Sequence, residues 1–309
     1  MRGNWTEEWQ NVHMLGEDSK RADTTHEAAP VVSIVVPHRG PPRDLWACLQ
    51  SLAAQTLSPG LYETIVVMNQ EKTGDFSVPC PANTHIVWEP QCHSYAARNR
   101  GVSHSRGKVI AFVDSDTQAS PDWLERGLEG IEAGADMVAG KIELTFVRTP
   151  LSPSACYEKL FAFDQEKNVN AGRSVTANLF VRRTVLEQLG GFDEAAESGD
   201  DFRWTRGATE SGFSLTYSKE AVVHHPAREK IGQLVHKARR VSRGFRRNLR
   251  GAHVAKEVLA HYRYRYLVAP SPSKLRACTT GERLQACMVS GFIQCVKVIS
   301  LVGPARSAP

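Results

Sequence analysis

Short apolar runs alternate with amphipathic segments over the first half of the chain. The β-branched run 31–36, which Pro37 ends, is typical of a strand buried on both faces of a sheet. Apolar residues at helical spacing follow over 45–53, and another apolar run covers 64–68, so this stretch predicts a β-α-β unit. The alternation continues with a strand at 85–88, a helix at 95–103, a strand at 108–113 and a helix after Pro121. We therefore expect an α/β fold with a mixed, mostly parallel sheet flanked by helices.

The periodicity weakens in the middle third. Residues 141–176 show no clean apolar spacing, which predicts an irregular, partly helical excursion over the edge of the sheet. A strand-like run resumes at 176–183, and two separate short strands are expected at 214–217 and 221–223. The sheet is therefore predicted to resume after this excursion.

The start of the chain is polar. Residues 1–30 lack sustained apolar periodicity and the apolar segment of a signal peptide, so we expect a flexible leader and a cytoplasmic protein. Composition agrees with a globular chain, because 41% hydrophobic and 23% charged residues fit neither disorder nor a fibrous repeat. The seven cysteines form no C-x-x-C pair, which argues against a disulfide framework and favours reduced thiols.

The C-terminal part is basic. Apolar positions from Ile231 to Phe245 share one helical face, and residues 228–250 contain nine Lys or Arg and one acid. This predicts a basic, partly amphipathic helical extension over 229–309, either a plain structural element or a surface for anionic lipid. The apolar stretch 284–303 is interrupted by polar residues, so we expect no membrane span there.

Two acids follow a strongly apolar strand. Asp114 and Asp116 leave it at its carboxyl end, where ligands of open α/β sheets collect. Carboxylates this close repel unless a cation lies between them, and hard divalent ions take oxygen ligands, although a turn with a helix cap has the same pattern. A second pair, Asp200 and Asp201, precedes a helical segment, and its position fits a helix cap and a general base equally.

Two basic motifs accompany the acids. His224-His225-Pro226 follows a strand, where a histidine can ligate a metal but is commonly structural. Arg98 lies in the run 95–108, whose cations suit phosphate oxygens or form a solvated helix face.

The ordered set of motifs resembles the family 2 glycosyltransferases, inverting enzymes with a GT-A fold. The segments PHRG, MNQ, AARNRG, AFVDSD, TANLFVRR, GGFDE, SGDD and AVVHHP carry the resemblance over residues 31–228. It implies a nucleotide-sugar donor, a hydroxyl acceptor on a glycan or a lipid-linked glycan, and a divalent metal, Mn²⁺ or Mg²⁺.

The resemblance also implies roles for single residues. Pro37 would line the nucleotide base pocket, with Asn69 in the segment that usually presents an acid to the base. Arg98 and Asn99 match a helix motif beside the nucleotide-sugar, and Asp114 opens the D-x-D motif. Because Met68 and Asn69 stand where many relatives have acids, the nucleotide is left open.

Four further residues complete the implied site. Asp116 matches the acid that holds the metal, and His225 the histidine after the last sheet strand. Asp201 matches the general base, and Asn178 would lie near the sugar and the acceptor. The chemistry follows, since a metal ion and Arg98 would neutralise the leaving diphosphate while Asp201 removes the acceptor proton.

Two other readings compete with this one. A non-catalytic module could dock the basic extension on a membrane or another polyanion, though no base-stacking aromatic pattern favours nucleic acid. A nucleotidyltransferase on a related fold would favour a Gly-rich phosphate loop with a lysine, which PHRGPPRD lacks. We expect an enzyme in the cytoplasm, peripheral on the inner face of the membrane.

Overall fold

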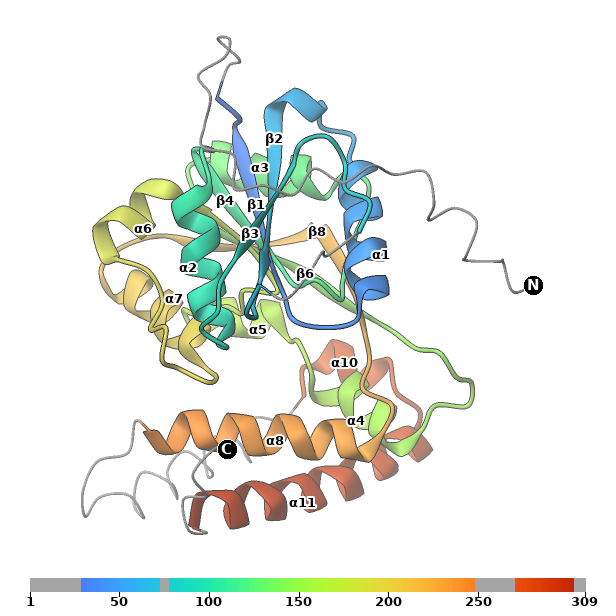
Figure 1. Cartoon of the computed structure of the whole chain (residues 1–309). Helices are drawn as coiled ribbons and strands as arrows, with labels where there is room; N and C mark the ends of the chain where they lie inside the picture. Colours follow the sequence, from blue (N-terminus) through green and yellow to red (C-terminus); the bar gives the residue numbers. More distant parts are fainter. Residues whose placement is uncertain (1–28, 73–77, 248–269, 303–309) are drawn as a thin grey trace.

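A single eight-stranded sheet forms the centre of the protein, in a computed structural model that describes residues 29–72, 78–247 and 270–302 (Figure 1). The strand order is β3-β2-β1-β4-β7-β6-β8-β5. The strands are β1 (Val32–His38), β2 (Tyr62–Met68), β3 (Thr84–Trp88), β4 (Val109–Val113), β5 (Gln118–Ala119), β6 (Met137–Thr145), β7 (Asn178–Arg182) and β8 (Leu215–Pro226). The first four in the order are parallel, and β7 runs antiparallel to both of its neighbours, which confirms a mixed, mostly parallel sheet.

Helices cover both faces of the sheet. They are α1 (Pro42–Ala53), the short η2 (Pro59–Leu61), α2 (Ser94–His104), α3 (Trp123–Glu132), α4 (Pro153–Phe161), α5 (Gln165–Asn170), α6 (Arg183–Leu189), α7 (Asp200–Glu210), α8 (Ile231–Arg247), α10 (Pro272–Arg276) and α11 (Thr280–Val302). One core cluster packs α1 and α3 on the sheet, and a second packs α2, α6 and α7 on the opposite face. The strand residues alternate between the clusters, since Ile34 belongs to the first and Val35 to the second.

Two expectations for the sheet are wrong. Residues 141–145 belong to strand β6 rather than to the irregular excursion expected over 141–176, because they alternate polar and apolar side chains instead of forming an apolar run. The two short strands expected at 214–217 and 221–223 are one strand, β8. Its pairing with β6 shifts register between Gly140 and Lys141, so β8 passes through an irregularity without ending.

A layer of four helices, α4, α8, α10 and α11, lies beside one end of the sheet (Figure 1). Leu234 and Ala238 of α8 form a buried cluster with Val289 and Ile293 of α11, and Tyr157 of α4 packs against it. The apolar face of α8 is therefore buried among helices. Some of the predicted segments lie outside the described part of the chain. They are residues 1–28 of the leader and residues 248–269 and 303–309 of the C-terminal extension.

Candidate active site

The predicted site residues Pro37, Asn69 and Asp114 lie where strands β1, β2 and β4 end. The parallel register pairs His38 with Met68, and the Asn69 N–H donates to the His38 carbonyl at 2.8 Å. Asp114 follows the last residue of β4 in the same sheet. Parallel strands place their carboxyl ends on one edge, so the loops after these strands meet there.

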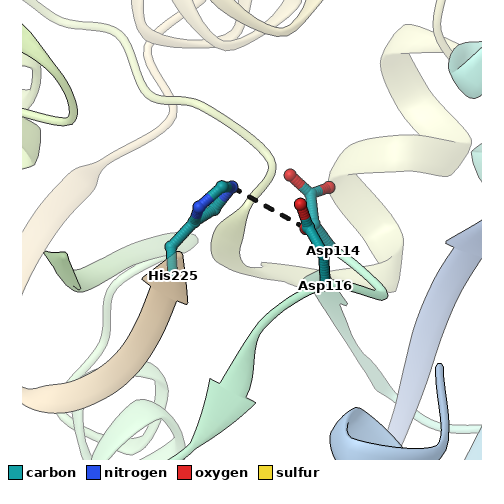
Figure 2. Close-up of side chains that lie close together, drawn as sticks. All are labelled: Asp114, Asp116 and His225. Atoms are coloured by element: carbon teal, nitrogen blue, oxygen red, sulfur yellow. Dashed lines mark ion pairs between the residues drawn. The ribbon is translucent and has the colours of Figure 1, made fainter. Parts of the chain in front are cut away.

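Asp114, Asp116 and His225 form a compact cluster at this edge (Figure 2). One ligand atom from each lies within 4.8 Å of the others, although His225 comes from β8, more than a hundred residues away in sequence. Two carboxylates and one imidazole form a donor set that suits a divalent ion of intermediate hardness such as Mn²⁺. Burial raises the pKa of Asp116, and the neighbouring His225 opposes this shift.

The His225 ring is held in one orientation. Its Nδ1 lies 2.8 Å from the Pro226 carbonyl, which can only accept, so Nδ1 carries a proton and the neutral ring has its lone pair on Nε2. Nε2 lies 3.7 Å from Asp116 Oδ1. The ring of Phe163 packs against the imidazole at a centroid distance of 4.7 Å. The backbone of Phe163 has a positive φ of 49°. These contacts present Nε2 as a metal ligand, as the outer contacts of ligating histidines usually do.

Arg98 connects α2 to the D-x-D loop. Its Nη2 donates to Asp114 Oδ1 at 2.8 Å, and only 7% of its side chain is exposed. Arg98 Nε is buried and has no hydrogen-bond partner among the described residues. A buried donor without a partner is costly, so a ligand oxygen at this point would satisfy it.

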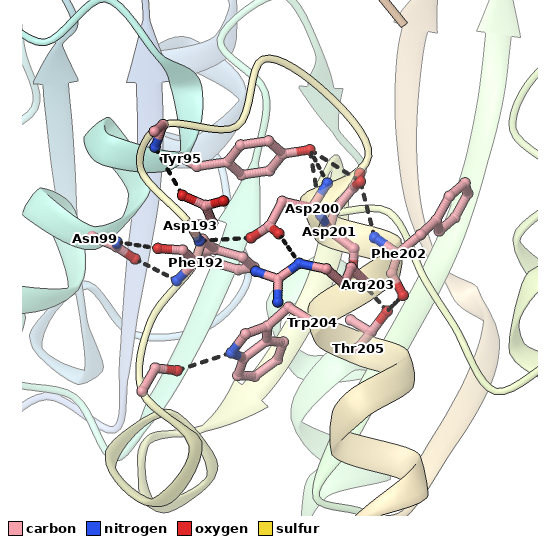
Figure 3. A network of polar contacts seen from close by, with 12 residues as sticks. Tyr95, Asn99, Phe192, Asp193, Asp200, Asp201, Phe202, Arg203, Trp204 and Thr205 are labelled. Atoms are coloured by element: carbon pink, nitrogen blue, oxygen red, sulfur yellow. Dashed lines mark hydrogen bonds and ion pairs between the residues drawn. The ribbon is translucent and has the colours of Figure 1, made fainter. Parts of the chain in front are cut away.

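The two acids of the second pair have different surroundings (Figure 3). Asp200 is 2% exposed, accepts the Asp193 N–H at 2.7 Å and pairs with Arg203, so both of its oxygens have structural partners. Asp201 Oδ1 accepts the Tyr95 hydroxyl at 3.1 Å and the Phe202 N–H at 3.0 Å. The second oxygen of Asp201 has no hydrogen bond within the described chain, which distinguishes Asp201 as the acid able to take a proton.

Burial raises the pKa of Asp201, and the Arg98 guanidinium is the largest opposing influence. Gly199 precedes the pair with a φ of 85°, a left-handed conformation that favours glycine, and it turns the chain into α7. The predicted helix start at this position is confirmed, and the acids lie in its first turn.

The loop that leads to Asp201 is held from two sides. Asn99 of α2 accepts the Phe192 N–H at 2.9 Å and donates to the Phe192 carbonyl at 2.9 Å, and a Cβ on Gly191 would lie 2.4 Å from its Oδ1. On the other side, Arg243 of α8 contacts Glu197 at 2.7 Å. Helices α2 and α8 thus fix this loop together.

Three asparagines therefore have structural partners. Asn99, predicted beside the nucleotide-sugar, binds the backbone of Phe192 and the side chain of Glu194 in this loop. Asn178, predicted near the sugar and the acceptor, is fully buried, where it accepts the Trp123 indole N–H and donates to two backbone carbonyls. Asn69 lies at the expected edge, but its amide nitrogen donates to the carbonyls of Glu89 and Gln91 at 3.3 and 2.6 Å.

The last two residues of β1, Pro37 and His38, also lie at this edge. Pro37 is half-buried in β1 and directly precedes His38 at the edge, and its contact with a nucleotide base stays a prediction. His38 is buried, with Nδ1 3.0 Å from the hydroxyl of Ser115 in the D-x-D loop, and burial lowers its pKa. Sequence analysis missed both His38 and Tyr95. The only signals are a histidine at the end of a strand and an aromatic residue in the first turn of α2.

An acidic cluster with a histidine at the carboxyl edge of an α/β sheet fits a glycosyltransferase, and comparison with known proteins shows this class. The family model described as glycosyl transferase family 2 matches residues 33–190. The chain belongs to this family and is an enzyme, as its motifs indicate.

Particular relatives agree. Glycosyltransferase AglE of Haloferax volcanii is 34% identical over 224 residues, which cover 70% of this chain and 73% of AglE. Glucosyl-dolichyl phosphate glucuronosyltransferase of the same organism is 28% identical over 199 residues, which cover 57% of this chain and 62% of that protein. The solved structure of mannosyltransferase PcManGT from Pyrobaculum calidifontis, in complex with GDP-Man and Mn²⁺, superposes with a TM-score of 0.59 at 15% identity. The superposition covers 90% of this chain and 89% of the PcManGT chain, and the two chains share the GT-A fold.

Proposed function

We propose that the enzyme transfers a sugar from a nucleotide-sugar to a hydroxyl group, with inversion at the anomeric carbon and with a divalent ion on Asp114, Asp116 and His225. The observation that carries this proposal is the pairing of a metal-type cluster with a separately held carboxylate, Asp201, whose second oxygen has no hydrogen bond within the described chain. Arg98 links the two, because it pairs with Asp114 and also lowers the pKa of Asp201.

The residues divide the reaction between them. When bound, the ion neutralises charge on the diphosphate leaving group. Arg98 adds a guanidinium whose buried Nε is available to a phosphate oxygen. Asp201 takes the acceptor hydroxyl proton while that oxygen forms its bond to the anomeric carbon from the face opposite the leaving group. The bond to the diphosphate breaks in the same displacement, and a nucleoside diphosphate leaves with the electron pair.

The acceptor is proposed to be a glycan or a lipid-linked glycan, used at the inner face of the membrane. The name of the glucuronosyltransferase relative, which includes a dolichyl phosphate, supports a lipid-linked acceptor. The nucleotide is left open, because the amide nitrogen of Asn69 is engaged with the backbone of the loop before α2.

A thermal-shift panel of nucleotide-sugars, each with Mn²⁺ or with excess EDTA, tests the proposal. A donor that binds the native state raises Tm, and we expect one nucleotide-sugar to do so only with the metal. The selected donor is then incubated with the enzyme, and release of nucleoside diphosphate is measured. Release of pyrophosphate would indicate a nucleotidyltransferase, and no turnover of any donor would favour a binding module.

A further inference from the structure

Helix α11 has two apolar faces. Its inner face is buried in the helical layer through Ala286, Val289 and Ile293. Its outer face carries four large apolar residues that are at least half exposed: Leu284 (65%), Met288 (69%), Phe292 (50%) and Ile299 (70%).

The exposed residues form one continuous stripe. Positions 284, 288, 292 and 299 recur at helical spacing, and Cys295 lies within the same face. At ~1.5 Å per residue the stripe runs for about 22 Å along the helix. Lys297 is the only charged residue between 284 and 302. A contiguous apolar surface of this length on a soluble fold marks a docking site.

The distribution of charge along the chain indicates which kind of partner docks on this stripe. Residues 229–309 contain 16 Lys or Arg and 3 acids, which give a net charge of +13. Residues 1–228 contain 22 Lys or Arg and 30 acids, which give a net charge of −8. The two parts together give the chain's net charge of +5. Within the described helices, Arg239, Arg276 and Arg283 are exposed in the same layer as α11. An apolar stripe on a segment with a net charge of +13 fits the interface of an anionic bilayer.

We propose that the outer face of α11 docks on an anionic membrane surface, with the helix lying in the plane of the interface. By its length of 22 residues over Thr280–Leu301 and by its mean hydropathy of 1.5 in an 18-residue window, this helix could also cross a membrane. Crossing would separate Val289 and Ile293 from Leu234 and Ala238 of α8, and the buried cluster they form would be lost. A helix that keeps this cluster lies on the membrane.

This assignment moves the lipid surface from α8, where the sequence suggested it, to α11. Leu234 and Ala238 of α8 are buried against α11, and Arg240 and Arg243 of α8 bind Glu197 at 3.2 and 2.7 Å. The inference deepens the proposed action at the membrane, but it does not depend on the reaction, because vesicle binding needs no substrate.

The native cysteines allow a test on the unmodified full chain. Cys295 lies within the stripe, whereas Cys80 and Cys92 are exposed on the sheet domain. The protein is mixed with neutral phosphatidylcholine vesicles or with vesicles that also contain phosphatidylglycerol, and alkylation by a membrane-impermeant maleimide is followed by mass spectrometry. We expect acidic vesicles to slow labelling of Cys295 by about fivefold or more, with Cys80 and Cys92 unchanged. Equal labelling of Cys295 with and without acidic vesicles would overturn the proposal.

A paired variant gives an independent result. Met288→Gln/Phe292→Gln removes apolar surface from the stripe, and Leu61→Gln/Ile86→Gln removes it from exposed positions on the sheet domain. With unchanged Tm, the first is expected to lower the partition onto acidic vesicles by about tenfold or more, and the second to leave it unchanged. Equal partition of both would contradict the proposal. Protection of Cys295 without vesicles, rising with protein concentration, would identify a second copy as the occupant and overturn it as well.

Discussion

Replacing Asp201 with Asn should separate catalysis from stability. An Asn oxygen can keep both hydrogen bonds that Asp201 Oδ1 accepts, from the Tyr95 hydroxyl and the Phe202 N–H. The second oxygen becomes an NH₂ group, which cannot accept the acceptor proton. We expect the transfer rate to fall by about 10²–10⁴, the usual contribution of a general base.

The stability of this variant should change in the opposite direction. Burial raises the pKa of Asp201, so the folded protein holds a proton there more tightly than the unfolded chain. The stability that this group contributes is present at low pH and is lost as the pH rises through the raised pKa. Asp201→Asn has no charge to bury, so its Tm should equal or exceed that of the wild type at neutral pH. The gain should disappear under acidic conditions.

Asp200→Asn is the matched control. Its carboxylate is nearly inaccessible and holds both the Asp193 N–H and the Arg203 side chain. An amide can keep one of these contacts, so the loss is about 1–3 kcal/mol, or roughly 3–10 °C in Tm. This variant should be less stable but should retain activity below its melting range.

Both properties are measured on the same preparations. Nucleoside diphosphate release is followed with saturating donor and Mn²⁺, and Tm is recorded at acidic and at neutral pH. Full activity of Asp201→Asn would refute the assignment of the base. An inactive Asp200→Asn with unchanged Tm would move that role to Asp200.

Three further changes test other parts of the site. Asp116→Asn should abolish the Mn²⁺-dependent rise in Tm with nucleotide-sugar, and a full shift in that variant would exclude Asp116 as a ligand. Asn69→Asp removes the donor to two backbone carbonyls, so urea unfolding should show a loss of about 1–3 kcal/mol; unchanged stability would argue against this role. Glu158→Gln leaves Lys237 and Arg228 without their carboxylate and should cost about 3 kcal/mol at neutral pH. Burial alone would raise the pKa of Glu158, but the two cations together lower it. The difference in stability between Glu158→Gln and the wild type should therefore vanish as the pH falls through that lowered pKa.

Local patterns were sufficient for much of the fold and for the acids of the site. Asp114 and Asp116 directly follow a buried strand, so sequence alone places them at a carboxyl edge. His225 joins them because β8 pairs in parallel with β6 and antiparallel with β5, where Gln118 lies opposite His224, and no local pattern specifies these long-range pairings.

The roles of the asparagines could not be predicted in the same way. Motif matching places Asn99 and Asn178 near a ligand, but the structure shows both amides bound to backbone and side-chain groups from distant segments. Only the assembled fold decides whether an amide faces a substrate or its own chain. The partner of the α8 apolar face was equally hidden, since the stripe itself fits a lipid surface and a neighbouring helix alike.

The contact between α8 and Glu197 also affects how the enzyme can be divided or recombined. A fragment that stops at the end of β8 would contain every acid and histidine of the site, yet it would lack Arg240 and Arg243, which hold the loop before Asp201. The same holds for chimaeras that exchange C-terminal helices with a relative, because the foreign helix must also offer cations to this loop. The smallest transferable catalytic unit therefore includes α8, together with α4 and α11, on which that helix packs.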